Sequence, residues 1–320
     1  MTERHRLALI GGRGYTGMSF LPLVRAHPLI DLALASSSSQ AGMPLSEIDS
    51  AWVNPNDVLV SLTPEQADSV EADIWVLALP NEQSKPWVAA IEAAHPEAVV
   101  IDFSADHRFD QDWVYGLTEL NRPALAGARR IANPGCYATA AGLALAPWAD
   151  WLATPPVIFG VSGHSGAGKT PSARNDPEKL ANNLIPYQLT GHVHEQEISA
   201  HLGRDVAFHP HVASFFRGLS VTIRAGFESR VDEAMLATRW REAYADSSFV
   251  EVVSDIPEIR QVAGSARAML GGISVDPRHP TYATCVVVLD NLLKGAASQA
   301  MQNINVGLGL QEQLGLEGLS

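Results

Sequence analysis

One of the two cysteines in the chain, Cys136, follows a Pro-Gly turn and leads directly into a helix-forming run. A single cysteine is most often a small, buried, apolar residue. In the first turn of a helix, however, unpaired backbone N–H groups and the positive end of the helix dipole favour the thiolate over the thiol. Cys136 is therefore a candidate nucleophile that needs a base and a substrate.

A histidine-rich segment offers that base, with His192, His194 and His201 close together. Glu197 follows His194 by three residues, so on a helix the two side chains share one face and the carboxylate can orient the imidazole. The segment could also be half of a metal site or a polar helix start. Because no cysteine is nearby and the order is not H-E-x-x-H, we favour acid–base catalysis by His194 and predict no metal.

Two arginines could bind an anionic group of a substrate. Arg108 lies just after a predicted parallel strand, at the strand end where sheets of this kind bind ligands. Arg217 stands in the second half of the chain, in the segment HPHVASFFRG. Each guanidinium could hold a carboxylate or phosphate through two hydrogen bonds, and a surface salt bridge would explain each arginine equally well.

Near the N-terminus, Gly12, Gly14 and Gly17 form a G-x-G-x-x-G pattern between a predicted strand and a predicted helix. In a dinucleotide-binding loop the first glycine makes the tight turn, the second lets the pyrophosphate approach the backbone, and the third allows close helix packing. The phosphates would then lie at the helix N-terminus. The pattern predicts a dinucleotide cofactor.

The next predicted strand ends in four serines, where an NAD-binding domain usually offers a carboxylate to the ribose. Hydroxyl groups without a repelling carboxylate suit a 2′-phosphate, and Arg13 can supply a cation. We therefore predict NADP (NADPH), although a plain serine-rich turn would have the same composition. The predicted cofactor-binding residues in this half are Gly12, Arg13, Gly14, Tyr15, Thr16, Gly17, Ser36 and Ser38.

The elements that must position these residues fall into two groups. Apolar runs separated by helix-length segments over residues 6–100 predict a doubly wound α/β architecture with a parallel sheet. Later strands have fewer crossover helices, which predicts an α+β domain with a mixed, largely antiparallel sheet. We expect a Rossmann-type NADP-binding domain over residues 1–140, completed by a C-terminal helix over 295–320, and a catalytic, substrate and oligomerisation domain over 141–294.

The composition is that of a folded protein, with 46% hydrophobic residues in 320. A net charge of −13 would repel a phosphate backbone, so we expect no nucleic-acid partner. No apolar run approaches the roughly 20 residues of a membrane span, and we expect no membrane partner. The start of the chain lacks a signal-peptide pattern and two cysteines make no disulfide framework, so we expect a cytoplasmic protein.

Eight segments of the chain, in this order, resemble the N-acetyl-γ-glutamyl-phosphate reductase family over essentially its whole length: GGRGYTG, DFSADHRF, YGLTELNR, NPGCYAT, SGHSGAGK, HVHEQEI, PHVASFFRG and KGAASQAMQN. The resemblance implies an oxidoreductase of arginine biosynthesis. It would use NADPH to reduce N-acetyl-L-glutamyl 5-phosphate to N-acetyl-L-glutamate 5-semialdehyde through a cysteine thioester. It also implies a homodimer or homotetramer.

By the same resemblance, Cys136 is the nucleophile and His194 the acid–base residue, while Ser165, Gly166 and Asn303 face the nicotinamide end of the cofactor. We expect Arg108 to hold the departing phosphate and Arg217 the substrate carboxylate, with His192 and Glu197 as orienting or substrate-binding residues. The chain departs from the usual family pattern at His107, Val193 and Gln196.

Three other functions are compatible with these residues. The first is the same chemistry on another acyl phosphate, either aspartyl phosphate or an aminoadipate-pathway substrate. The second is a cysteine-histidine hydrolase, which would leave the N-terminal α/β domain without a purpose. The third is an NADP-binding regulatory protein without catalysis.

Overall fold

The computed structural model describes residues 4–319, which divide into two compact units. Unit 1 runs to Pro134 and also includes Ala296–Gly318, whereas unit 2 comprises Gly135–Gly295 together with Leu319. The division falls before the boundary that we expected at residue 140. Cys136 and the helix that it begins therefore belong to unit 2.

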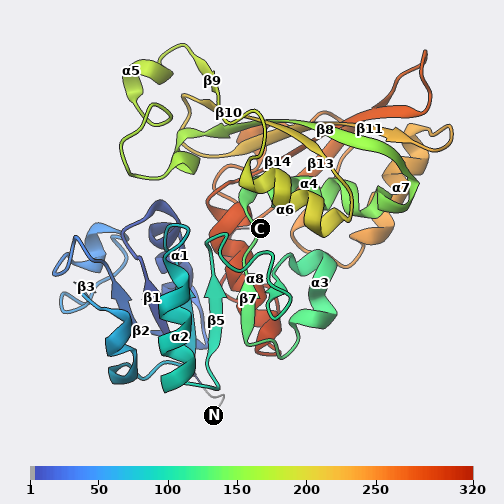
Figure 1. Ribbon diagram of the computed structural model, residues 1–320. Coiled ribbons are helices and arrows are strands. Elements are labelled where there is room, and N and C mark those ends of the chain that lie inside the picture. Colours follow the sequence, from blue (N-terminus) through green and yellow to red (C-terminus); the bar gives the residue numbers. More distant parts are fainter. Residues whose placement is uncertain (1–3, 320) are drawn as a thin grey trace. The chain divides into compact units, whose positions relative to one another are not determined.

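Unit 1 is built on a seven-stranded sheet with the order β3-β2-β1-β4-β5-β7-β6 (Figure 1). Every pairing between these strands is parallel, so the predicted doubly wound architecture is confirmed. The strands are β1 (His5–Ile10), β2 (Ile30–Ser36), β3 (Leu59–Val60), β4 (Ile74–Leu77), β5 (Val99–Asp102), β6 (Val114–Tyr115) and β7 (Arg130–Ala132). The helices are α1 (Tyr15–Ala26), α2 (Ser84–Ala94), α3 (Thr118–Leu125) and α8 (Ser298–Gly307).

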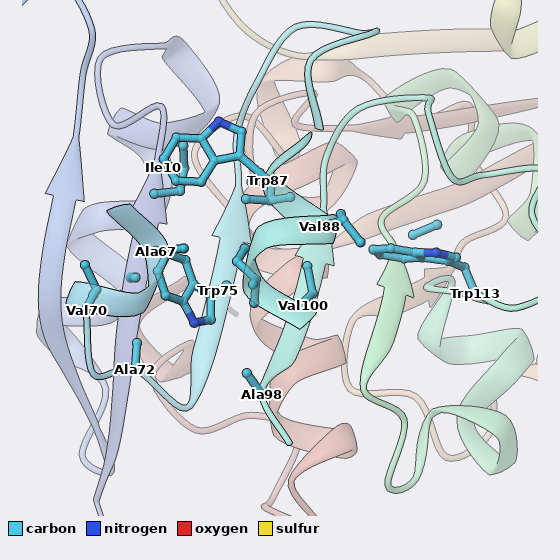
Figure 2. Close-up of a cluster of buried hydrophobic side chains, with 14 residues drawn as sticks. Ile10, Ala67, Val70, Ala72, Trp75, Trp87, Val88, Ala98, Val100 and Trp113 are labelled. Carbon is cyan, nitrogen blue, oxygen red and sulfur yellow. The ribbon is translucent and has the colours of Figure 1, made fainter. Parts of the chain in front are cut away.

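The helix α2 covers one face of this sheet, and its packing explains why the segment is helical. Trp87, Val88 and Ile91 are buried on α2 and follow helical spacing. Figure 2 shows Trp87 and Val88 with Trp75 of β4 and Val100 of β5, in one cluster of buried side chains. Burial of side chains of this size stabilises the fold by about 1.5–3 kcal/mol each.

The C-terminal helix α8 packs against α3 and β5. It ends at Gly307, so the helix that we expected over 295–320 is shorter, and a π-helical turn, Leu293–Ala297, precedes it. Amide side chains on α8 are buried and hydrogen-bonded. For example, the Asn305 amide donates to the carbonyls of Glu312 and Leu314, which ties the following segment back onto the helix.

Unit 2 contains a second seven-stranded sheet with the order β12-β13-β14-β11-β8-β10-β9. Four pairings are antiparallel and two, β8 with β10 and β12 with β13, are parallel. The predicted mixed, largely antiparallel sheet is therefore confirmed. The strands are β8 (Leu152–Gly163), β9 (Leu184–Pro186), β10 (Ala207–Ala213), β11 (Leu219–Phe227), β12 (Val250–Val252), β13 (Ala268–Val275) and β14 (Tyr282–Leu289).

Helices cover one face of the unit 2 sheet. They are α4 (Cys136–Leu145), α6 (Val193–Leu202) and α7 (Glu233–Ala243), and a single short turn, α5 (Pro177–Leu180), lies in a loop. The helices α4 and α6 pack side by side, α4 against β11 and β14 and α6 against β10 (Figure 1). On β8, Ile158 is buried while its neighbours Val157 and Phe159 are exposed, so side chains alternate between the covered and the open face.

In the part of the chain that the structure describes, no helix combines the length and the apolar character needed to span a bilayer. The second cysteine, Cys285, is completely buried in β14, where burial raises the pKa of its thiol. This position confirms the expectation of an inert core residue for Cys285.

Candidate active site

Cys136 is the first residue of α4 and is partly buried. Gly135 is the N-cap, with an extended backbone (φ −72°, ψ 150°), and its carbonyl accepts the first helical hydrogen bond, from Thr139 N, at 2.8 Å. The N–H groups of the first helical turn therefore surround the base of the Cys136 side chain. The geometry matches the setting that lowers the energy of a thiolate.

The turn before Cys136 is fixed by Glu197, a completely buried residue of α6. Its Oε1 accepts the N–H of Gly135 at 2.8 Å. This contact joins the start of α4 to α6, and it is a role that the local sequence did not indicate. The predicted orientation of His194 by Glu197 stays a prediction.

A second contact at the nucleophile comes from Gly295, in the π-helical turn. A Cβ atom placed on Gly295 would lie 2.6 Å from Cys136 Cβ and 3.1 Å from Cys136 Cα. Only glycine can therefore occupy this position without moving the nucleophile. The residue lies in the quoted segment KGAASQAMQN, but nothing local to that segment showed its contact with Cys136.

His192 and His194 lie at the start of α6 and have different environments. His192 is the N-cap, and its Nδ1 accepts the N–H of His194 at 3.1 Å. Burial, with a smaller effect from the positive charge of Arg174, lowers the pKa of His192 to about 4, while Glu195 opposes this shift. His192 is therefore neutral at neutral pH, and it positions the first turn of the helix that carries His194.

The surroundings of His194 are aromatic. Its ring centroid lies 5.8 Å from that of Tyr137 and 4.9 Å from that of His192. Tyr137 donates its hydroxyl to the carbonyl of His211 at 2.9 Å. Burial, with a smaller effect from Cys136, raises the pKa of Tyr187 to about 12, so the hydroxyl of Tyr187 stays protonated at neutral pH.

The two candidate anion-binding arginines lie in different units. Arg217 of unit 2 is one-third exposed, and its Nε lies 3.0 Å from Oδ2 of Asp290, which is completely buried. Arg108 of unit 1 is buried, and it donates to the carbonyls of Asn133 at 3.0 Å and Phe103 at 2.7 Å. Two of the Arg108 nitrogens thus already support backbone.

The glycine loop lies between β1 and α1. The left-handed backbone of the tight turn is at Gly11 (φ +93°) rather than at Gly12, and both N–H groups donate to the Ser36 carbonyl. At Gly17 a Cβ would meet Gly11 O at 2.5 Å, so this glycine is required for close helix packing, as predicted. At Gly14 a Cβ would meet only Gly11 O, at an ordinary 3.6 Å. The protein itself does not require glycine at position 14, which fits a ligand that approaches the backbone there.

The serine-rich turn after β2 brings its last serine to the glycine loop. Arg13 Nη1 donates to Ser39 Oγ at 2.6 Å, so a cation and a hydroxyl lie together at the end of β2. Ser36 is buried, whereas Ser38 is exposed. Tyr15 and Thr16 form the first turn of α1. The residues present fit a dinucleotide with a 2′-phosphate, and Ser39 is a better candidate for that phosphate than Ser36.

The residues expected at the nicotinamide end are also divided between the units. Ser165, in unit 2, is buried and accepts a hydrogen bond from Asn291 at 2.9 Å, and Gly166 follows it in the same 3-10 turn. Asn303, in unit 1, is buried and donates to the Gly116 carbonyl and to Asn133 Oδ1. The cofactor contacts of these residues stay a prediction.

His107, which departs from the family pattern, stacks on Trp113 with ring centroids 4.1 Å apart. The imidazole of His107 therefore stacks on Trp113 as an aromatic side chain at this position could. Among residues 4–319, no cluster of three or more His, Cys, Asp or Glu side chains is arranged to hold a metal ion.

Two family models match the chain in the order of its units: the semialdehyde dehydrogenase NAD binding domain over residues 6–128, and the semialdehyde dehydrogenase dimerisation domain over residues 136–291. Together the two models cover most of the chain and place it in the class of semialdehyde dehydrogenases. Within this class, relatives that are 43% and 46% identical over 97% of this chain show that it belongs to the N-acetyl-γ-glutamyl-phosphate reductase family.

Its curated relatives support this assignment over almost the full length. The N-acetyl-gamma-glutamyl-phosphate reductase of Xanthomonas axonopodis pv. citri (strain 306) is 46% identical over 313 residues, which cover 97% of this chain and 98% of the relative. The enzyme of the same name from Xylella fastidiosa (strain M23) is 43% identical over 311 residues, with 97% and 94% covered.

Solved structures agree on the fold. Aspartate semialdehyde dehydrogenase II from Vibrio cholerae, complexed with ASA, aligns with a TM-score of 0.75 and 22% identity, covering 95% of this chain and 98% of that one. Aspartate semialdehyde dehydrogenase with NADP from Candida albicans aligns with a TM-score of 0.68 and 16% identity, covering 99% and 100%.

Proposed function

We propose that this chain reduces N-acetyl-L-glutamyl 5-phosphate to N-acetyl-L-glutamate 5-semialdehyde, with NADPH as reductant and release of phosphate, as a step of arginine biosynthesis. The observation that carries the proposal is Cys136 at the N-terminus of α4, with Gly135 held by Glu197. Relatives of this name match almost the whole chain.

The first half-reaction forms a covalent bond to the protein. The Cys136 thiolate attacks the acyl carbon of the substrate, and the carbonyl becomes a tetrahedral oxyanion. The oxyanion collapses and the C–O bond to phosphate breaks, which leaves a thioester on Cys136 and free phosphate. Because the leaving group departs as phosphate, no proton has to reach it from Cys136.

The second half-reaction returns the thiolate. When bound at the glycine loop, NADPH would supply the hydride for reduction of the thioester carbonyl. His194 would protonate the oxyanion formed on Cys136 and take the proton back as the thiohemiacetal collapses, with the C–S bond breaking to give the aldehyde and the thiolate. His192 keeps the first turn of α6 in place through its contact with the His194 N–H.

The cofactor would be held by the glycine loop and the turn after β2. Backbone N–H groups at the start of α1 suit the pyrophosphate, and Gly14 leaves it room. Arg13 and Ser39 suit the 2′-phosphate.

We assign the two arginines to the two anionic ends of the substrate. Arg217 holds the α-carboxylate, since its guanidinium is partly exposed and forms an ion pair with Asp290 on its Nε side. Arg108 holds the phosphate, although carbonyls of Phe103 and Asn133 already occupy two of its nitrogens. This assignment makes Arg217 the specificity residue for the carboxylate.

We also propose that the active form is a homodimer, or a homotetramer made of such dimers, in the cytoplasm. The open face of the unit 2 sheet exposes Val157 and Phe159, which are 43% and 42% exposed. Apolar side chains on a sheet face without helices favour burial against a second copy. The matched model of this unit is described as a dimerisation domain. The thiol of Cys136 is in no disulfide, which suits the reducing cytoplasm.

The test of the proposed function is the reverse assay. NADP reduction is followed at a fixed concentration of phosphate, with N-acetylglutamate semialdehyde and aspartate semialdehyde compared side by side. Strong preference for the acetylated substrate supports the proposal. Turnover of aspartate semialdehyde alone would keep the chemistry and change the substrate, and no turnover of either would remove the enzymatic function.

A further inference from the structure

Asp290 follows β14 and is completely buried, yet the mechanism above gives it no role. Its Oδ2 accepts the Gly264 N–H at 2.6 Å and lies 3.0 Å from Arg217 Nε. Its Oδ1 accepts the N–H groups of Leu292 and Leu293 at 2.9 and 3.1 Å. Three backbone donors thus converge on a single carboxylate, which also forms an ion pair with the guanidinium of Arg217.

The same residue holds the turn that lies against the nucleophile. The N–H of Gly295 donates to the backbone carbonyl of Asp290 at 2.9 Å. Gly295 belongs to the π-helical turn Leu293–Ala297, and it leaves no room for a side chain beside Cys136. Single π-helical turns are uncommon and occur frequently at functional sites. Asp290 therefore connects Arg217 to the backbone that packs on Cys136.

The next residue, Asn291, reinforces this arrangement and is also buried. Its Oδ1 accepts the Gly218 N–H at 2.7 Å, and its Nδ2 donates to Ser165 Oγ at 2.9 Å. Gly218 follows Arg217 directly and has a positive φ of +99°. The backbone next to Arg217 is therefore held by Asn291, while the guanidinium forms an ion pair with Asp290.

We infer that Asp290 is the positioning residue for substrate recognition: its carboxylate pairs with Arg217 on the Nε side of the guanidinium, so that the two terminal nitrogens are left for the substrate carboxylate. This inference rests on the proposed function. A guanidinium with an ion-pair partner on its Nε side keeps its two terminal nitrogens for a second, bidentate partner. The buried carboxylate restricts the side-chain rotation of Arg217 before substrate binds. Less conformational entropy is then lost on binding.

Because Asp290 is charged, the direction of the change in KM when it is replaced distinguishes two accounts of its role. If Asp290 acted only through its negative charge, its removal would make the site more positive, and an anionic substrate would bind more tightly. If Asp290 positions Arg217, its removal releases the guanidinium, and the substrate binds more weakly. The two accounts predict opposite changes in KM.

The experiment uses Asp290→Asn, which keeps the size of the side chain and one of the two oxygens that accept backbone N–H groups, replaces the other with an NH2 group and removes the charge. In the reverse assay we expect KM for N-acetylglutamate semialdehyde to rise about tenfold or more, the effect of losing one oriented charge-assisted hydrogen bond. The matched control is Asp276→Asn, the same change beside another arginine, Arg278. We expect its KM to stay within about twofold of wild type.

The double variant Asp290→Asn/Arg217→Gln shows whether Asp290 acts through Arg217. We expect its KM to equal that of Arg217→Gln alone. An unchanged or lower KM in Asp290→Asn, or additive effects in the double variant, would overturn the inference. Failure of the proposed function looks different, because wild type itself would then not oxidise N-acetylglutamate semialdehyde.

If Asp290→Asn shows no cooperative thermal unfolding, Arg217→Lys replaces it. Lysine can keep the ion pair with Asp290 but has no second pair of nitrogens. We expect KM to rise about tenfold while the rate of Cys136 alkylation by iodoacetamide stays that of wild type. An unchanged KM in Arg217→Lys would contradict the presentation of the terminal nitrogens to substrate.

Discussion

At the scale of single residues, Cys136 is held by groups that are distant in the sequence. Glu197 fixes the N–H of Gly135 on one side, and Gly295 packs on Cys136 on the other. The helix N-terminus can favour a thiolate only if the side chain stays in its first turn. We therefore expect these two contacts to keep Cys136 in the first turn of α4, where its thiolate is favoured.

The Gly295→Ala variant tests the second contact. A Cβ at 2.6 Å from Cys136 Cβ forces the two segments apart, so we expect kcat to fall at least tenfold, with a loss of stability of about 1–3 kcal/mol. The measurements are steady-state kinetics and thermal unfolding. Gly318→Ala is the control, since a Cβ there meets no atom within 4 Å. Wild-type kinetics in Gly295→Ala would show that the contact does not constrain the nucleophile.

The sequence predicted the chemistry of individual residues better than their contacts. The Pro-Gly turn and the helix-forming run are local, so the place of Cys136 at a helix N-terminus was predictable. The spacing led us to expect that Glu197 acts on His194, three residues away, but it could not indicate the contact that Glu197 makes with Gly135, 62 residues away. The contact of Arg217 with Asp290 is similarly long-range. Such contacts depend on how sheets and helices pack, which no local spacing encodes.

At the scale of elements, the loop between β1 and α1 contains glycines with two different roles, close packing at Gly17 and ligand approach at Gly14. Gly17→Ala brings a Cβ to 2.5 Å from Gly11 O, so we expect it to destabilise unit 1 by about 1–3 kcal/mol. Gly14→Ala has room within the protein, so we expect wild-type stability and a loss of NADPH affinity. Thermal unfolding and NADPH fluorescence titration measure the two effects. Equal destabilisation by both variants would contradict a ligand-related role for Gly14.

The N-cap of α6 makes stability depend on pH. The pKa of His192 is lowered from 6.5 to about 4 in the folded protein, so the unfolded chain binds its proton at a higher pH than the folded one does. This contribution to stability is complete above about pH 6.5 and is lost as the pH falls from there toward 4. Protonation at Nδ1 would also remove the acceptor of the His194 N–H.

The variant His192→Asn isolates this contribution, because asparagine is a good N-cap without a titrating group. We expect the melting temperature to fall less between pH 7 and pH 5 in His192→Asn than in wild type. Identical pH profiles would show that His192 does not cause the effect.

Elements with a strong pattern were predicted, and short or unusual ones were not. The apolar runs of β1, β2, β4 and β5 are long enough to be recognised, whereas β3 and β6 have two residues each. The strand β13 contains Gly271 and Gly272, which interrupt its pattern and coincide with a register shift against β14. The C-terminal helix was predicted too long because its apolar residues continue past Gly307 in segments held by side-chain hydrogen bonds.

At the scale of the whole molecule, the open face of the unit 2 sheet predicts how copies associate. The Phe159→Glu variant places a charge among apolar side chains that we expect to be buried between two subunits. We expect light scattering after size-exclusion chromatography to show a shift toward monomer at micromolar concentrations. The control is Met235→Glu on α7, where the side chain is 44% exposed, compared with 42% for Phe159. An unchanged mass for Phe159→Glu would exclude this face as the interface.

The central claim is that Cys136 carries the acyl group between the two half-reactions. The most direct measurement is the absorbance of NADPH at 340 nm after wild-type enzyme is mixed with NADP and N-acetylglutamate semialdehyde in the absence of phosphate. We predict a rapid burst of about one NADPH per active subunit, because the thioester forms but has no phosphate to release it, and continued turnover once phosphate is added. Cys136→Ser should show no burst while it binds NADPH with wild-type affinity. A burst that survives in Cys136→Ser, or wild-type turnover that begins only with phosphate and shows no burst, would contradict the thioester mechanism.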